Sequence, residues 1–203
     1  MELERFLDKL SSDTPTPGGG SVSALAGALS ASLVAMVAGL SSKKDKTKKK
    51  EMEGIRKNGL SIQKRLVRAI DEDSKSFDAV IQALRLPRNS DKERLRRVRE
   101  TQKAYQKATR TPQLVCQLSL HLLEYSKTLV LKGNPNAISD AGVAAFLADA
   151  ALAGGLLNIS INLVAVTEKR YSKKMNLLMR NWARKRNQVM KTILKKLVGT
   201  RRG

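Results

Sequence analysis

A run of twenty residues without a single charge constrains this chain more than any other feature of its sequence. The run, 21–40, reads SVSALAGALSASLVAMVAGL, and its small residues recur at helical spacing. Small residues spaced in this way let helix backbones approach closely. A helix with no charged face must be surrounded by protein, from this chain or from a second copy. Because the run is rich in Ala, Ser and Gly rather than in Leu, Ile and Phe, we favour a buried core helix over a membrane span.

The other segments also carry helical periods, and β-hairpin signals are missing. We therefore predict an all-α fold, an antiparallel bundle of about six helices that forms a single domain over 1–203. Ser21 is the expected N-cap of the second helix, and Ser90 with Glu93 forms a capping box at the fourth. The expected helices cover about 2–11, 21–41, 47–85, 90–130 with a break or kink at Pro112, 138–168 and a basic helix over 172–198.

The net charge is +21, from 39 Lys and Arg against 18 Asp and Glu, which predicts attraction to anions without saying which. Aromatic residues are almost absent from the basic segments, so base-stacking platforms are not expected. Because Cys116 is the only cysteine and no signal peptide is visible, we expect a cytoplasmic protein. The single histidine, His121, leaves little for a Ser-His-Asp triad or a histidine metal site. The basic segments are 43–50, 85–110, 169–186 and 191–202.

A turn rich in proline and glycine leads directly into the uncharged helix. Residues 14–21 read TPTPGGGS. Glycines let backbone come close to a ligand, and the free N–H groups at a helix start favour anions. Three glycines exceed what a turn needs, so we interpret this segment as a ligand-binding loop, with a plain helix–helix turn as the alternative. The candidate binding residues are Pro17, Gly18, Gly19, Gly20 and Ser21.

One carboxyl group falls on the apolar face of the helix over 47–85. At 100° per residue, Asp73 lies beside Ile70 and Phe77, whereas Asp71 and Glu72 point away. A carboxylate on an apolar face is costly unless it is paired or used, and burial raises its pKa toward the range that suits proton transfer. Asp73 is therefore a candidate catalytic residue, with an ion-paired structural role as the alternative.

A polar loop precedes the helix over 138–168. It contains Asn134 and Asn136, and it runs into Ser139 and Asp140 at the start of that helix. These last two side chains either cap the helix or bind a ligand.

Two amides lie near the other end of the same helix. Asn158 and Asn162 are one turn apart among apolar residues, and buried amides need partners. Their alternative role is to pin helices together. Asp140 and Asn158 are about 27 Å apart along one straight helix. They cannot both touch one small group within one subunit, so a long ligand or a second subunit is needed.

Together these stretches resemble the formiminotetrahydrofolate cyclodeaminase / methenyltetrahydrofolate cyclohydrolase family. The resemblance covers most of 1–165 in the family's order, and it implies an all-helical homodimer that binds folate in a groove and works without a metal. The matching stretches are PTPGGGSVSALAGALSASLVAMVAGL, DSKSFDAVIQALRLPR, the ATRTP region and GNPNAISDAGVAAFLADAALAGGLLNISINL.

The resemblance also implies roles for single residues. The acidic residue of the family's D-x-x-[AS]-F stretch matches Asp73, and its Ser-Asp pair matches Ser139 and Asp140. We expect Asp73 to be the catalytic base, with Asp140 supporting it or holding the pterin ring. Lys43 and Lys44 suit the glutamate tail of folate, although the family's usual glycine and tyrosine are missing from this stretch.

Two reactions fit this resemblance. One, a lyase reaction, converts 5-formimino-tetrahydrofolate to 5,10-methenyl-tetrahydrofolate and ammonia; the other, a hydrolase reaction, opens 5,10-methenyl-tetrahydrofolate to 10-formyl-tetrahydrofolate. The expected partners are a tetrahydrofolate derivative, with or without a polyglutamyl tail, and a second copy of the chain, but no membrane and no metal. The alternatives are a basic helical protein that binds nucleic acid and an inactive paralogue that serves as an interaction subunit.

Overall fold

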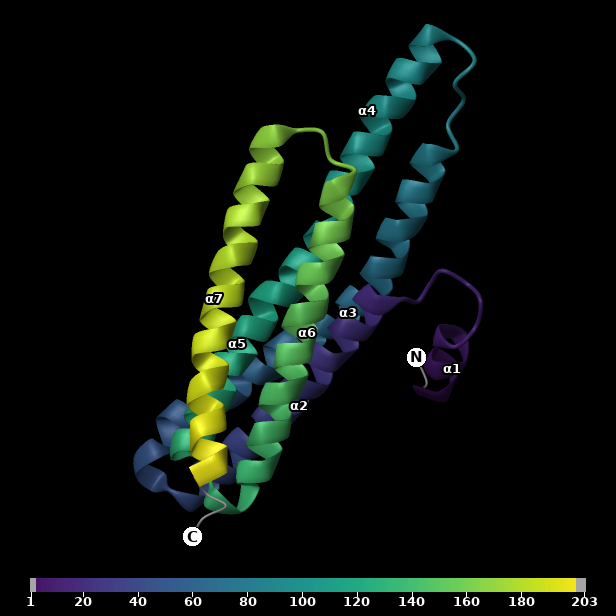
Figure 1. Ribbon diagram of the computed structural model, residues 1–203. Helices are drawn as coiled ribbons and strands as arrows, with labels where there is room; N and C mark the ends of the chain where they lie inside the picture. Colours follow the sequence, from purple (N-terminus) through teal and green to yellow (C-terminus); the bar gives the residue numbers. More distant parts are fainter. Residues whose placement is uncertain (1–2, 200–203) are drawn as a thin grey trace.

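The computed structural model describes residues 3–199, and over that range it consists of helices and short connections without a strand (Figure 1). The all-α prediction is therefore confirmed. The long helices run alongside one another as a bundle, and the C-terminal part of α3 forms an antiparallel pair with α4 at one end. The helices are α1 (Leu3–Leu10), α2 (Gly19–Lys44), α3 (Lys49–Leu84), α4 (Asp91–Ala108), α5 (Arg110–Lys132), α6 (Ile138–Val164) and α7 (Lys169–Gly199), with 3-10 turns η1 (Lys46–Lys48) and η2 (Pro135–Ala137).

Helix α2, which contains the uncharged run 21–40, forms the centre of the bundle, packed against α3, α5 and α6. Its small residues allow close approach. A Cβ built on Gly59 of α3 would lie 3.3 Å from the backbone oxygen of Ala31, and one on Gly27 would lie 2.9 Å from Leu66 Cδ1. Helix contact this close replaces aromatic bulk in the core with many short van der Waals contacts.

Two segments, α2 and residues 135–164 including α6, are long and apolar enough to cross a membrane by length and composition. Within the protein, 61% of the apolar window of α2 is buried, but only 44% of that in 135–164. The burial of α2 fits the predicted core helix, whereas α6 keeps an apolar face exposed.

Two predicted helix boundaries were wrong. The helix expected over 90–130 is two helices, and the break falls at the buried Thr109 rather than at Pro112. Pro112 lies in the first turn of α5, where its missing N–H costs no helical hydrogen bond. The expected helix over 138–168 ends at Val164, and α7 begins at Lys169.

Of the two predicted helix N-caps, one is confirmed and one is wrong. Ser90 forms the predicted capping box with Glu93. Ser21 is not the N-cap of α2, because the helix begins earlier and Gly18 occupies that position. Neither Ser139 nor Asp140 caps α6, whose N-cap is Ala137.

The basic helix α7 packs along α5 and α6 on the outside of the bundle (Figure 1). Its buried side chains include Trp182 and Val189, and Arg186 fixes it to α6 through two hydrogen bonds of 2.5 and 2.6 Å to Asp149. The opposite side of α7 carries its lysines and arginines, so the predicted basic face is confirmed.

Candidate active site

A cleft of about 510 Å³ opens where α2 begins. One side is polar and is formed by the glycine turn with Asp73 of α3. The other side is apolar, and α3, α4 and α6 supply Ile81, Tyr105 and Ile161 to it. A cleft with one apolar wall and a few convergent polar groups is the usual form of a small-molecule site.

Asp73 is held at the cleft by the first turn of α2. The Ser21 hydroxyl donates to Asp73 Oδ2 at 3.1 Å and also lies 3.0 Å from the Ile70 carbonyl oxygen. Ser21 is fully buried, so it positions the carboxyl group rather than meeting a ligand. The cap expected at this serine is thus replaced by a contact between helices.

Burial raises the pKa of Asp73 above its ordinary value, and hydrogen bonds from the hydroxyl and backbone N–H of Ser21 partly oppose the rise. No lysine or arginine in the described part of the chain pairs with this carboxyl group. The alternative of an ion-paired structural Asp is therefore not what the structure shows. A carboxyl group in this state can accept and return a proton nearer neutral pH.

The glycines of the turn make room for this carboxyl group. A Cβ built on Gly20 would lie 2.5 Å from Asp73 Cγ, and one on Gly18 would lie 3.3 Å from the Pro15 carbonyl oxygen. Gly19 lines the cleft opposite Asn158. No glycine among residues 3–199 has a positive φ, so these positions need glycine for space and not for backbone conformation.

The two amides of α6 lie on the cleft wall as well. The Asn158 side chain donates to the Gly154 carbonyl oxygen of its own helix at 2.8 Å, and Asn162 donates to the Ala108 carbonyl oxygen at 3.4 Å. Asn162 therefore does tie α6 to the end of α4, as its alternative role requires. Both amide oxygens have no hydrogen bond inside the described chain and can face a ligand.

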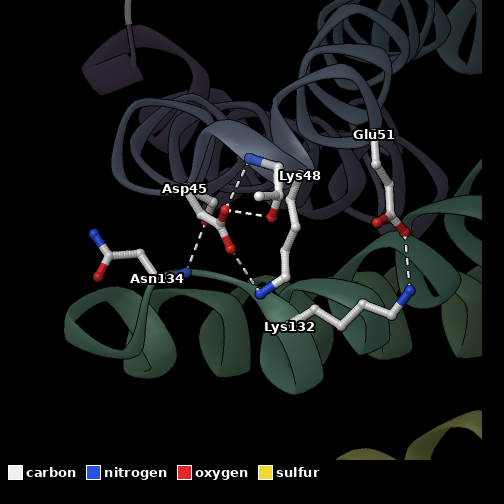
Figure 2. Close-up of polar contacts among 7 residues, drawn as sticks. Asp45, Lys48, Glu51, Lys132 and Asn134 are labelled. Carbon is white, nitrogen blue, oxygen red and sulfur yellow. Dashed lines mark hydrogen bonds and ion pairs between the residues drawn. The ribbon is translucent and has the colours of Figure 1, made fainter.

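The remaining candidate residues lie at or near the opposite end of α2, the region in which Figure 2 labels Asn134. Lys44 Nζ donates to Asn134 Oδ1 at 3.3 Å, and the Asn134 backbone N–H donates to the Ser41 hydroxyl at 2.8 Å. A smaller hollow of about 160 Å³ lies here, and Ser41, Lys44 and Asn134 are among the residues that line it. Residues placed at or beside this end are Lys43, Lys44, Asn134, Asn136, Ser139 and Asp140.

Two ion pairs lie at this end of the bundle. Figure 2 shows Lys48 beside Asp45 and Lys132 beside Glu51, and the nitrogen–oxygen distances of these pairs are 3.0 and 3.2 Å. Hydrogen bonds from Thr47, then from Lys48, lower the pKa of Asp45 to about 2. Asp45 therefore stays ionised and neutralises part of the lysine cluster.

Within one chain, the structure does not bring the two groups of candidates together. Gly20 and Lys44 lie at opposite ends of α2, about 36 Å apart along its axis. Asp140 does not line the Asp73 cleft of its own chain.

Sequence reasoning missed part of the cleft wall. Val80, Ile81 and Leu84 line the cleft; helical spacing places Ile81 and Leu84 on the apolar face beside Asp73, but they were not predicted to be part of the site. Tyr105 comes from α4, and no pattern in the sequence connects it with Asp73. Among residues 3–199 no group of three His, Cys, Asp or Glu side chains is arranged to hold a metal ion.

The model of the formiminotransferase-cyclodeaminase family matches residues 2–181. The chain belongs to this family. The methenyltetrahydrofolate cyclohydrolase of Methylorubrum extorquens is 35% identical over 174 residues, which cover 85% of this chain and 84% of that protein. The formimidoyltransferase-cyclodeaminase of Gallus gallus is 32% identical over 83% of this chain, and the match spans 32% of the chicken protein.

Structural comparison agrees with the family assignment. The formiminotetrahydrofolate cyclodeaminase of Thermotoga maritima superposes with a TM-score of 0.88 at 27% identity, over 98% of this chain and 97% of that one. The family expected from the sequence, and its helical fold, are thereby confirmed. The family match ends at residue 181, within the basic helix α7.

Proposed function

We propose that this member of the family is a one-carbon folate enzyme that hydrolyses 5,10-methenyl-tetrahydrofolate to 10-formyl-tetrahydrofolate, with Asp73 as the base. The observation that carries the proposal is a partly buried carboxyl group of raised pKa, without an ionic partner, at an open cleft with an apolar wall. The hydrolase is favoured because a relative of that name matches over most of its own length.

The reaction asks for one proton acceptor close to one carbon. Water adds to the methenyl carbon between N5 and N10, and Asp73 takes the proton that water loses. The carbon–N5 bond then breaks as N5 receives the proton held by Asp73, and the hydroxyl on that carbon loses its own proton to solvent and becomes the formyl oxygen. The raised pKa of Asp73 suits both taking and returning that proton. The scheme assigns no step to a metal, so prolonged dialysis against EDTA should leave turnover unchanged.

The deaminase reaction is the second candidate, and it is favoured by the likeness to the Thermotoga maritima structure. Here N10 attacks the formimino carbon, Asp73 takes the N10 proton, and the departing nitrogen is protonated and leaves as ammonia. Both reactions need the same carboxyl group near the same carbon.

An assay with both substrates tests the proposal. The purified chain is offered 5,10-methenyl- and 5-formimino-tetrahydrofolate in turn, and the absorbance of the methenyl species is followed. The proposal expects the first to disappear faster than in the absence of protein. Appearance of methenyl product from the second substrate alone would replace the hydrolase with the deaminase, and no change with either would refute both.

We also infer that two copies of the chain complete the site. The α2 and α6 surfaces expose Leu29, Met36 and Phe146, and the C-terminal part of α6 exposes Leu157 and Ile161 at 71% and 68%. Apolar surface of this kind on adjacent helices is typical of a protein interface. If the twofold axis is perpendicular to α2, the α2 of the second copy lies antiparallel to that of the first.

Antiparallel pairing would set the Lys44 end of one copy beside the Asp73 cleft of the other. Such a site accommodates a long folate: the pterin would lie at Asp73, and the glutamate tail, with or without further glutamates, would reach the lysines of the partner. This arrangement also answers the 27 Å between Asp140 and Asn158, because the two would then belong to different copies.

Complementation tests the shared site. Asp73→Asn and Asp140→Asn are prepared as separate proteins, each with low turnover, and then mixed and allowed to exchange subunits. If the site is shared, a mixed dimer contains one intact site, and the mixture regains on the order of a quarter of wild-type turnover. A mixture as inactive as its components would show that each site lies within one chain.

A further inference from the structure

The outer face of α7 carries a straight row of cations that the folate site does not use. Lys173, Arg180, Arg184, Lys191 and Lys195 are separated by seven or four residues, so they share one side of the helix. All five are exposed. The row is about 33 Å long.

This row lies opposite the packed side of the helix. The buried residues Met175, Trp182, Val189 and Ile193 face the bundle. The row therefore lies along the outside of the molecule, where Figure 1 shows α7 (yellow) as a rod beside α5 and α6.

The charge of the row is not neutralised by the chain itself. Residues 169–199 contain no Asp or Glu. Arg186, which faces α6, is paired with Asp149, but the five cations of the row make no ion pair with any residue in 3–199. Single surface charges are usually just solvated, but a row of one sign without an acidic side chain along it creates a field that attracts a polyanion.

We propose that the α7 row (Lys173, Arg180, Arg184, Lys191 and Lys195) binds the phosphate backbone of a nucleic-acid duplex, without regard to sequence. The length of the row is close to one turn of a B-form duplex, about 34 Å. Regularly spaced lysines and arginines bind phosphates by charge and release counterions.

Two other polyanions fit less well. A membrane-surface helix inserts its apolar face between lipids, and that face of α7 is already buried against α5 and α6. Single-stranded nucleic acid is usually held by stacking on exposed aromatic rings, and here Trp182 is buried and Tyr171 half-buried. A rigid duplex, held by its phosphates alone, needs neither.

The test compares two variants of equal charge in the full chain. The row variant changes Lys173, Arg180, Arg184 and Lys191 to Gln. The control variant changes Lys57, Lys64, Arg65 and Arg68 to Gln, which removes the same number of exposed lysines and arginines from α3. Circular dichroism checks the fold of each variant, and both should keep whatever folate turnover the wild type has. Because duplex binding is measured directly, the result does not depend on the proposed folate activity.

Binding of a labelled duplex is measured by fluorescence anisotropy over a series of salt concentrations. The wild type should bind with steep salt dependence. The row variant should bind about tenfold or more weakly. Its slope of log K against log salt should become shallower, with a magnitude smaller by about 3 to 4. The control variant should lose much less affinity.

Three outcomes would overturn the proposal. One is that the wild type does not bind the duplex, and another is that both variants lose affinity equally. The third is that vesicles of equal parts phosphatidylglycerol and phosphatidylcholine, or poly-L-glutamate, bind more tightly than the duplex and depend on the row.

Discussion

At the scale of single residues, the site depends on how Asp73 is held and on the absence of an ionic partner for its carboxyl group in residues 3–199. Ser21 donates hydrogen bonds to this carboxyl group. Its pKa is raised because the effect of burial outweighs the effect of those hydrogen bonds. Because the folded state holds the proton of Asp73 more tightly than the unfolded chain does, the ionised carboxylate costs stability as pH rises through the raised pKa.

Asp73→Asn should therefore separate stability from activity. We expect turnover to fall by about 100-fold or more, the usual contribution of a general base. At neutral pH the melting temperature should stay the same or rise, because the variant has no charge to bury. Steady-state kinetics and thermal melts check this, and near-normal turnover would remove Asp73 from the mechanism.

The pH profile of the wild type follows from the same shift. If ionised Asp73 is the base, kcat/KM should fall as pH drops through a pKa above the ordinary 3.8, so the acid limb lies at higher pH than for an exposed Asp. The limb should be missing from the residual activity of Asp73→Asn. An acid limb at the ordinary position would contradict the assigned role.

Glycines 20 and 54 form a matched pair for testing the space around Asp73. A Cβ on Gly20 would overlap the carboxyl group, so Gly20→Ala should reduce turnover by about tenfold or more through misplacement of the base. A Cβ on Gly54 meets nothing within 4 Å, so Gly54→Ala should add about 0.5–1 kcal/mol to the free energy of unfolding with turnover unchanged. Denaturant unfolding and assays measure both, and equal behaviour of the two variants would contradict the packing described.

At the scale of helices, the sequence predicted the apolar faces well and the ends less well. The face of α3 that holds Asp73, and the helix over the uncharged run 21–40, follow from helical periodicity. The break between α4 and α5 was expected at Pro112 and falls at Thr109, because a proline in the first turn of a helix and a proline that ends one look alike in the sequence. The role of Ser21 depends on which helix crosses α2 at that turn, and that is a tertiary fact.

The attachment of α7 to α6 is testable at this scale. Arg186→Gln removes two hydrogen bonds and leaves Asp149 partly buried without a partner. We expect the free energy of unfolding to fall by about 1–2 kcal/mol. Arg184→Gln, on the exposed side of the same helix, should change it by no more than about 0.5 kcal/mol. Similar losses in both would mean that general charge, and not the pair, holds α7.

At the scale of the whole molecule, the chain leaves an apolar surface on α2 and α6, and it leaves the Lys44 end of α2 far from Asp73. The sequence alone indicated a separation of the same kind, because the helical rise places Asp140 about 27 Å from Asn158. Which residues of α6 stay exposed could not be predicted, because its sequence is apolar on nearly every side.

Phe146→Glu tests whether that surface joins two copies. Phe146 is 49% exposed in the single chain, so the change should spare the fold of each copy, but it would place a charge in the proposed interface. Sedimentation should show monomers, and turnover should be lost although Asp73 is intact. Leu95→Glu, at a 73% exposed position of α4, should change neither. A wild type that sediments as a monomer, or an active Phe146→Glu dimer, would refute the inferred pairing.

The missing side chain at Gly20 has a practical consequence for protein engineering. Replacing helical glycines by alanine is a common route to heat-resistant proteins, and α2 and α3 both offer such positions. In this chain one of those positions, Gly20, leaves room for the carboxyl group of Asp73, the proposed base. A stabilisation campaign should therefore begin at residue 54 and leave residue 20 untouched, since a methyl group there would displace the Asp73 side chain from the cleft.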